Sequence, residues 1–229
     1  MKRILSLVLV LVFFTLLLAG CGDKRKTETV YVTIADKSGK VVLAREEIEA
    51  KDLDGDEKVT IFEALKAAHK TCPAGADGFD AVDSEYGLSM TKLWGEDNGG
   101  SYGYYQNEAA AMSLSDEVKE GDRIVAFSYT DTTFWSDTFC YFDNQEATVK
   151  KGETVTLTLT ALMYDLVDYT KMVPTAVAGA TITVNGTAIE TKTDAEGKIT
   201  LTLEKGENVI SASSDLMTLV PPIAKITVQ

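Results

Sequence analysis

The sequence predicts an α+β fold: a small β-rich domain with one main helix, followed by an all-β sandwich. Two observations lead to this prediction. Helical periodicity is confined to one convincing segment, residues 61–70. Beyond about residue 146, short alternating strands separated by turn signals take over. We therefore expect domains at 29–146 and 147–229.

The first twenty residues have the pattern of an export signal. Lys2 and Arg3 precede a run over residues 4–18 that is apolar except for Ser6 and Thr15, and this run is short for a membrane-spanning helix. Small residues then lead to Cys21, so the pattern predicts a signal peptide, residues 1–20, that is cut before this cysteine. The alternative is an uncleaved N-terminal helix. In both cases we expect the rest of the chain to work outside the cytoplasm.

The segment Leu18-Ala19-Gly20-Cys21 resembles the lipobox of bacterial lipoproteins. The resemblance implies that Cys21 carries a diacylglyceryl group and becomes the first residue of the mature protein. Two acyl chains anchor a protein stably, whereas a single chain binds only marginally. The expected location is thus the extracytoplasmic face of the cell membrane, to which Cys21 binds. Residues 21–28 would form the lipidated cysteine and a short polar tether.

Charge restricts the class of partner that we expect, and the cysteine content restricts the number of disulfides. Removing residues 1–20 takes away two basic residues and changes the formal net charge from −13 to −15. Because phosphate binding needs a basic stripe that this sequence lacks, nucleic acid is excluded as an expected partner. Cys72 and Cys140 leave two alternatives open, one internal disulfide or two unpaired thiols.

The first domain is expected to combine strands with a single helix. Residues 29–34 alternate apolar and polar side chains, which is typical of a half-buried strand. In the helix, Ile61, Leu65 and Ala68 share one face, so this face should pack on the sheet. Two further strands are expected, at 103–106 and 123–129.

An acidic loop stands directly before the helix, at residues 52–63. A twelve-residue calcium loop places oxygen ligands at positions 1, 3, 5, 7, 9 and 12, because calcium takes six to eight oxygen ligands. The residues at these positions are Asp52, Asp54, Asp56, Lys58, Thr60 and Glu63. Lys58 would contribute its backbone carbonyl, and Glu63 both carboxylate oxygens. The sequence therefore predicts calcium as a cofactor.

One position departs from this pattern. Glu57 stands at position six, where such loops carry a left-handed glycine, and a side chain there costs on the order of 1 kcal/mol. The preceding segment, 40–51, reads as strand and charged turn, so we expect a single loop of EF-hand or dockerin type. The alternative is a solvated acidic turn that caps the helix without metal, because carboxylates favour a helix N-terminus.

A second cluster is aromatic and lies in a Gly-rich segment. The candidate ligand-binding residues are Trp94, Tyr104, Tyr105 and Asn107. Aromatic rings beside glycine and asparagine can form a platform for a sugar or a planar ring system. Tyr104 and Tyr105 point to opposite faces of a strand, so at most one of them lies in any one pocket. The alternative role for most of these rings is core packing.

Three short motifs within residues 29–142 carry a family resemblance. They are Val59–Leu65, Gly103–Asn107 and Val118–Ile124. In this order they resemble the transcobalamin-like C-terminal domain of bacterial surface proteins, which is related in fold to the smaller β-rich domain of vitamin B12 carriers. The resemblance implies a small-molecule surface, with a corrinoid as candidate ligand. The acidic loop before the helix departs from the family pattern.

The second domain is predicted from strands and turns. Asn185-Gly186 is a hairpin signal because a type I′ turn needs positive φ at both central residues, and Gly197 closes a second reversal. The expected strands are 154–160, 181–184, 198–203, 209–213 and 224–228. This pattern indicates an antiparallel sandwich of immunoglobulin-like type. Residues 179–213 resemble the immunoglobulin-like or prealbumin-like spacers of bacterial surface proteins.

No motif in the sequence points to catalysis, and we expect no enzyme. His69 is the only histidine and lies three residues from Cys72. A helix-surface position is the expected role of His69, in preference to a catalytic dyad. Residues 99–103 match the letters Gly-x-Ser-x-Gly, but a strand and not a helix is expected to follow, whereas a nucleophile elbow leads into a helix. The sequence contains no Gly-rich phosphate loop.

The expected function is that of a membrane-anchored lipoprotein that binds calcium and serves as a ligand-binding module, for a corrinoid or another small molecule. The alternative is a cell-surface adhesion or envelope module that binds protein or glycan. A buried aromatic pocket near Trp94 and Tyr104 would favour the first function. A flat exposed aromatic strip would favour the second.

Overall fold

The computed structural model describes residues 25–72, 76–85 and 87–229. The predicted signal peptide and Cys21 lie outside the described residues. Across the described part, the chain is mostly β-sheet with one α-helix, which confirms the expectation of a β-rich chain with one main helix. No helix among these residues is long and apolar enough to cross a membrane.

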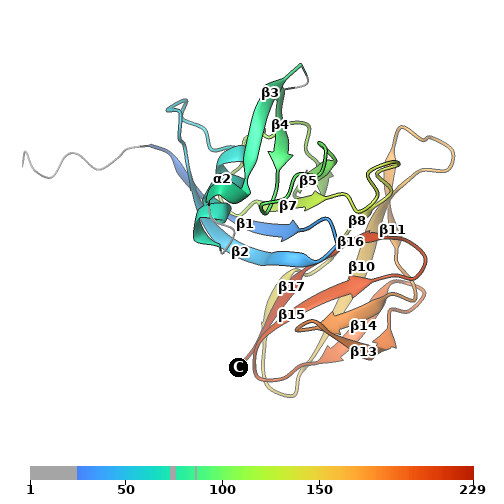
Figure 1. Ribbon diagram of the computed structural model, residues 1–229. Coiled ribbons are helices and arrows are strands. Elements are labelled where there is room, and N and C mark those ends of the chain that lie inside the picture. The colour runs from blue at the N-terminus through green and yellow to red at the C-terminus, as the bar shows by residue number, and fades with distance from the viewer. Residues whose placement is uncertain (1–24, 73–75, 86) are drawn as a thin grey trace, which may run out of the picture.

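The first half builds a five-stranded sheet in the order β2-β1-β7-β5-β6 (Figure 1). Its strands are β1 (Thr27–Ala35), β2 (Val41–Lys51), β5 (Tyr102–Gln106), β6 (Ala109–Ala110) and β7 (Arg123–Ser128). β1 pairs antiparallel with β2 and parallel with β7. The expected tether is shorter than residues 21–28, because β1 already pairs with β2 from Thr27 onward.

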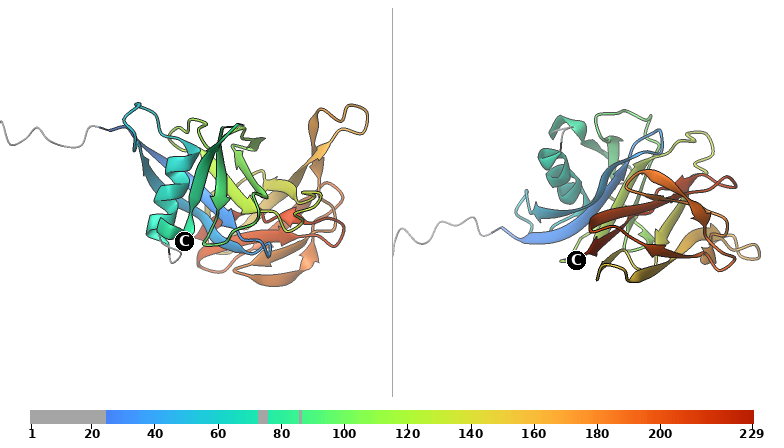
Figure 2. Two further views of the ribbon diagram at one scale, coloured as in Figure 1. Left: turned by 45° about the horizontal axis from the view of Figure 1, so that its top comes forward. Right: turned by 90° about the horizontal axis from the view of Figure 1, so that it is seen from below.

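Helix α2 (Ile61–Thr71) covers one face of this sheet (Figure 2). Ile61, Leu65 and Ala68 are fully buried, as their shared face predicts. They join a core that includes Val30 and Val32 of β1. The short 3-10 helix η1 (Ala76–Gly78) and a two-stranded ribbon, β3 (Asp80–Ser84) with β4 (Gly87–Lys92), complete the first half.

The second half is a β-sandwich, as expected. One sheet has the order β11-β10-β8-β16 with β14 also paired to β10, and the other has the order β13-β12-β15-β17-β9. Apolar side chains of both sheets fill the space between them, Leu159 and Ile226 among them. The strands are β8 (Thr138–Phe142), β9 (Glu146–Val149), β10 (Thr154–Tyr164), β11 (Met172–Ala176), β12 (Thr181–Val184), β13 (Thr187–Lys192), β14 (Lys198–Thr202), β15 (Gly206–Ser213), β16 (Leu219–Val220) and β17 (Ala224–Val228).

The boundary between the halves lies earlier than residues 146/147. β8 pairs with β10 and β16, and its residues Cys140 and Phe142 belong to the sandwich core. The sequence of β8 is a short, almost continuous apolar run that fits either half. Its assignment depends on pairing with β10, which is a long-range contact that local pattern does not reveal.

A third apolar cluster joins the two halves. Ala35 and Phe127 from the first sheet pack with Phe139 and Val220 from the sandwich. Ion pairs also cross the junction, with Arg45 Nη1 at 2.8 Å from Glu146 Oε2 and Lys225 Nζ at 2.8 Å from Glu46 Oε1. The halves are therefore packed against each other and are not separated by an open linker.

Candidate functional site

The acidic loop brings three carboxylates together in front of α2. Oxygens of Asp52, Asp54 and Glu63 lie within 4.8 Å of one another. Asp52 is only 1% exposed and Glu63 only 5% exposed. Because a buried carboxylate needs hydrogen bonds or an opposite charge, the loop must satisfy these groups.

Backbone amides of the loop donate to both buried carboxylates. Asp52 accepts from Gly55 N at 2.6 Å and from Glu57 N at 3.2 Å, and these bonds, the one from Gly55 first, hold the pKa of Asp52 below its ordinary value. Glu63 accepts from Leu53 N at 2.5 Å. The chain thus curls around the carboxylate group, and the donor set suits a hard cation by its oxygen chemistry.

Glu63 has a second role at the start of α2. Thr60 N donates to Glu63 Oε2 at 2.9 Å, and Glu63 N donates to Thr60 Oγ1 at 3.4 Å. This is a capping box, which satisfies two amides that the first helical turn leaves free. The alternative role predicted for the loop, a helix cap, is therefore present in the structure whether or not a cation binds.

Glu57 has φ of 66°, so position six of the loop is left-handed although it is not glycine. Asp56 is not one of the three grouped carboxylates, and Thr60 Oγ1 lies 3.1 Å from Glu63 Oε2. Asp56 Oδ1 accepts from Lys58 N at 2.8 Å, and Thr60 is engaged in the cap.

The aromatic residues divide between two clusters. Trp94 and Tyr104 are half-buried against the core of the first half, whereas Tyr105 packs in the cluster at the junction. The Tyr105 ring stacks on Phe139 with centroids 3.8 Å apart, and burial raises the pKa of Tyr105 to about 12. The opposite faces expected for Tyr104 and Tyr105 are thus observed, and these aromatic candidates do not converge on one pocket.

Trp94 is held by His69 of α2. His69 is fully buried, contrary to the expected helix-surface position. Its Nδ1 lies 2.7 Å from Leu65 O, and Trp94 N donates to its Nε2 at 3.1 Å, so the pair of contacts fits the neutral tautomer with the proton on Nδ1. The helical pattern did not predict this burial of His69, because the loop around Trp94 covers the C-terminal end of α2.

The side chain of Asn107 stabilises the backbone of a turn. It has φ of 48°, its Nδ2 donates to Asp122 Oδ1 at 2.6 Å, and its Oδ1 accepts from Arg123 N at 2.9 Å. These bonds fix the turn after β5. The side chain that this segment presents to a pocket is the neighbouring Glu108.

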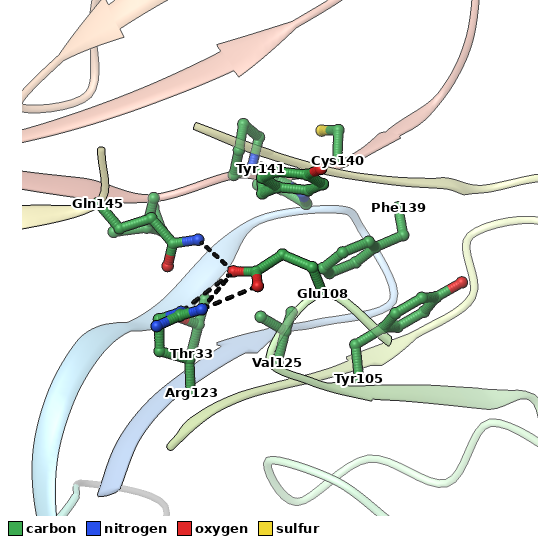
Figure 3. Close-up of a pocket in the computed structure, with 12 residues that line it drawn as sticks. Thr33, Tyr105, Glu108, Arg123, Val125, Phe139, Cys140, Tyr141 and Gln145 are labelled. Atoms are coloured by element: carbon green, nitrogen blue, oxygen red, sulfur yellow. Dashed lines mark hydrogen bonds and ion pairs between the residues drawn. The ribbon is translucent and has the colours of Figure 1, made fainter. Parts of the chain in front are cut away.

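A pocket at the junction is centred on Glu108 (Figure 3). Glu108 accepts from Arg123 Nη2 at 2.8 Å and from Gln145 Nε2 at 2.9 Å. The free volume is about 20 Å³, close to that of a single water. The Glu108, Arg123 and Gln145 network therefore joins the two halves, and the pocket on the Tyr105 side of it is too small for a large planar ligand. The same three side chains also line a polar hollow of about 370 Å³ that Tyr105 does not line.

Sequence reasoning missed a projecting apolar hairpin. The turn between β10 and β11 extends away from the body of the molecule (Figure 1). Leu166 is 84% exposed and Val167 is 93% exposed. We call the exposed apolar side chains of this hairpin the apolar tip, namely Met163, Tyr164, Leu166, Val167, Tyr169 and Met172. The sequence feature that could have revealed this hairpin is a set of large apolar residues between aspartates in a turn region.

The hairpin turn is ordered by its own hydrogen bonds. Asp165 Oδ1 accepts from Val167 N at 2.7 Å and from Asp168 N at 2.9 Å. Lys171 Nζ lies 2.7 Å from Asp168 Oδ2. These bonds hold the apolar side chains outward before any partner arrives, which lowers the entropy cost of binding.

A second loop exposes aromatic rings. Phe134 and Trp135 lie between β7 and β8 and are largely exposed. Asp131 Oδ1 accepts from Phe134 N at 3.1 Å, and Trp135 Nε1 donates to Ser101 Oγ at 3.2 Å. This loop is therefore preorganised in the same manner as the hairpin.

No protein-family model and no curated protein sequence matches the chain. Among solved structures, the fibronectin(III)-like modules of Clostridium thermocellum CbhA share 12% identity over 56% of this chain and 77% of theirs, with a TM-score of 0.30. The Ig1-2 module of the Drosophila receptor protein tyrosine phosphatase DLAR also shares 12% identity, over 90% and 98% of the two chains, with a TM-score of 0.30.

A glycan-binding structure is also similar to this chain. Bacteroides ovatus SGBP-B, solved in complex with a mixed-linkage heptasaccharide, shares 14% identity over 66% of this chain and 36% of its own, with a TM-score of 0.24. Similarities at this level carry no argument about function. The fold description therefore rests on strand order and burial in this chain.

Within the described residues, Cys72 and Cys140 are unpaired, which decides between the two alternatives. Cys72 follows α2, whereas Cys140 is buried in the sandwich core. Cys140 Sγ donates to Val220 O at 3.2 Å, and burial raises the pKa of its thiol. A thiol of this kind is a structural residue without nucleophilic character.

Proposed function

We propose that this protein is a non-catalytic contact module that binds a protein partner through the apolar tip. The observation that carries the proposal is the exposure of Leu166 and Val167 on an ordered, projecting hairpin. Exposed apolar patches rimmed by polar groups mark interaction sites, because water disfavours them in an isolated molecule. The adhesion alternative drawn from the sequence is therefore the one that the geometry supports best.

The small-molecule function has less support. It requires an enclosed aromatic pocket near Trp94 and Tyr104, and both rings instead pack against the first core. The described pocket that Tyr105 lines has a volume of about 20 Å³. The transcobalamin-like resemblance is thus proposed for the fold of the first half, as a small α+β domain before an immunoglobulin-like sandwich, and not for corrinoid binding.

A protein partner suits the tip better than a glycan does. Sugars stack on flat aromatic rings and need polar groups around them. Leu166 and Val167 at the summit of the hairpin are aliphatic, and such side chains insert into apolar pockets on proteins. Tyr164 and Tyr169 would add aromatic contact area beside them.

The position of the tip fits a lipid-anchored protein. The start of β1 and the β10–β11 hairpin lie at opposite ends of the molecule (Figures 1 and 2). With Cys21 in the membrane, the hairpin would point outward from the cell. Calcium in the acidic loop would then stabilise the membrane-proximal half, with no part in the contact itself.

A binding comparison tests the proposal. Residues 22–229 keep both apolar cores, since these cores lie within residues 30–228. This chain is immobilised and exposed in turn to cobalamin, to a glycan panel and to a surface-protein extract of the producing cells. We expect saturable binding from the extract alone. Protease treatment of the extract should abolish the signal.

A further inference from the structure

An apolar groove lies where the first half meets the outer face of the sandwich. Its volume is about 570 Å³, which lies within the range of sites that bury a small ligand or several side chains. Both halves contribute to it, through β2, β15 and the segment before β17. The apolar lining residues are Val41, Ala44, Val209, Ala212, Pro221 and Ile223.

The apolar tip and this groove have complementary chemistry. The tip presents aliphatic side chains flanked by Asp165 and Asp168, and Lys171 is paired with Asp168. Hydrogen bonds from backbone amides hold the pKa of Asp165 below its ordinary value, so this flank stays negative at neutral pH. The groove carries Lys40, an exposed positive side chain, on its wall. The apolar tip thus has negative side chains beside it, and the apolar groove has the positive side chain of Lys40, which also interacts with Asp36, on its wall.

The apolar tip cannot occupy the groove of its own copy. The hairpin projects away from the body in every view, whereas the groove is formed by the body itself (Figures 1 and 2). We propose that the apolar tip of one copy docks in the groove of a second copy. The inference rests on the proposed function and names its partner. Such a head-to-tail contact is heterologous, so it repeats along a line of copies instead of closing into a symmetric dimer.

Sedimentation velocity of residues 22–229 tests this contact. The buffer contains reductant, because Cys72 is partly exposed and could cross-link copies. The tip variant carries Leu166→Ser with Val167→Ser, and the groove variant carries Ala44→Glu, which adds bulk and a charge that repels the acidic tip. Met112→Ser is the matched control, since Met112 is 85% exposed on the first half.

The unmodified chain should form dimers and longer species as its concentration rises, and Met112→Ser should do the same. Each interface variant alone should sediment as a monomer, with self-association weakened at least about tenfold. An equimolar mixture of the tip and groove variants should form a dimer and nothing larger. In that mixture one intact tip meets one intact groove, and the other contact is blocked.

Two results would overturn the inference. If the unmodified chain stays monomeric at all concentrations, copies do not bind each other. If the tip variant dissociates the assembly but the groove variant does not, the tips meet each other symmetrically. Val209→Glu replaces Ala44→Glu if the latter lowers the melting temperature. A monomeric chain that still binds the surface extract would leave the proposed function standing. A chain that neither self-associates nor binds the extract would contradict both the inference and the proposed function.

Discussion

At the scale of single residues, Gly103 shows how closely the first half is packed. A Cβ atom on Gly103 would lie 2.3 Å from Cζ of Phe127, whose side chain is only 2% exposed. Gly103 is not at positive φ, so the constraint is space and not backbone conformation. The strand β5 therefore depends on glycine to lie against the Phe127 ring.

We expect Gly103→Ala to lower the free energy of unfolding by about 1–3 kcal/mol, because the added methyl overpacks a buried site. Urea unfolding of residues 22–229 measures this change. Phe127→Leu removes the ring atoms that the methyl would meet. The double variant should therefore lose less than the sum of the two single losses, and a simple sum would contradict the packing explanation.

His69 makes the stability depend on pH. Burial lowers the pKa of His69 in the folded state, so the unfolded chain takes up a proton at a higher pH than the folded chain does. The stabilisation is complete above the unfolded value of about 6.5 and is lost as pH falls through the folded pKa.

The free energy of unfolding should thus fall between pH 7.5 and pH 5, and it should fall less in His69→Gln, which has no titrating imidazole. Urea titrations at several pH values measure both slopes. Identical slopes for the two chains would show that His69 does not titrate differently on folding.

Residue conformation was the least predictable property of the candidate site. The acidic positions of the loop were evident in the sequence, but the left-handed Glu57 was not, because glycine is the usual signal for that conformation. Trp94 also has positive φ, at 52°, and this orients its amide toward His69. Neither residue type predicts such a backbone, so tertiary contacts must impose it.

At the scale of elements, the acidic loop and α2 form one unit with two separable roles. Asp54 belongs to the carboxylate group but does not cap the helix, whereas Thr60 caps the helix through its hydroxyl. A metal role and a capping role therefore respond to different substitutions.

Calcium at 1 mM should stabilise the chain by about 0.4–1.4 kcal/mol if the site binds in the 0.1–1 mM range of extracellular modules. Melting temperatures in calcium and in chelator measure the effect, and the difference should vanish in Asp54→Ala, which has no side-chain oxygen. Asp80→Asn, an exposed acid outside the loop, is the control. Thr60→Ala should cost about 0.5–2 kcal/mol in both conditions. Equal melting temperatures for the unmodified chain would leave the loop as a cap alone.

Elements with strong local signals were predictable from the sequence. Strands β12 and β17 have the expected bounds, and Asn185 and Gly186 have φ of 50° and 77°, as their turn type requires. The ribbon β3–β4 was missed because most of β3 is exposed and shows no apolar alternation. β8 was placed in the wrong half because a short apolar run does not identify its partner strand.

At the scale of the whole molecule, the two halves act as one body. The apolar cluster around Phe127 and Phe139 and the Glu108, Arg123 and Gln145 network connect them. Residues far apart in the sequence meet here, so no local pattern could have revealed the junction. The same holds for the groove, which needs both halves, and for the projection of the hairpin beyond them.

The most direct test of the contact function compares two exposed apolar sites on the same molecule. Leu166→Ser with Val167→Ser removes the summit of the apolar tip, and Met112→Ser removes an equally exposed side chain elsewhere. Biolayer interferometry against the surface-protein extract should show binding weakened at least about tenfold by the tip variant and unchanged by the control. Equal binding by both variants, or binding to cobalamin that persists in both, would contradict the account.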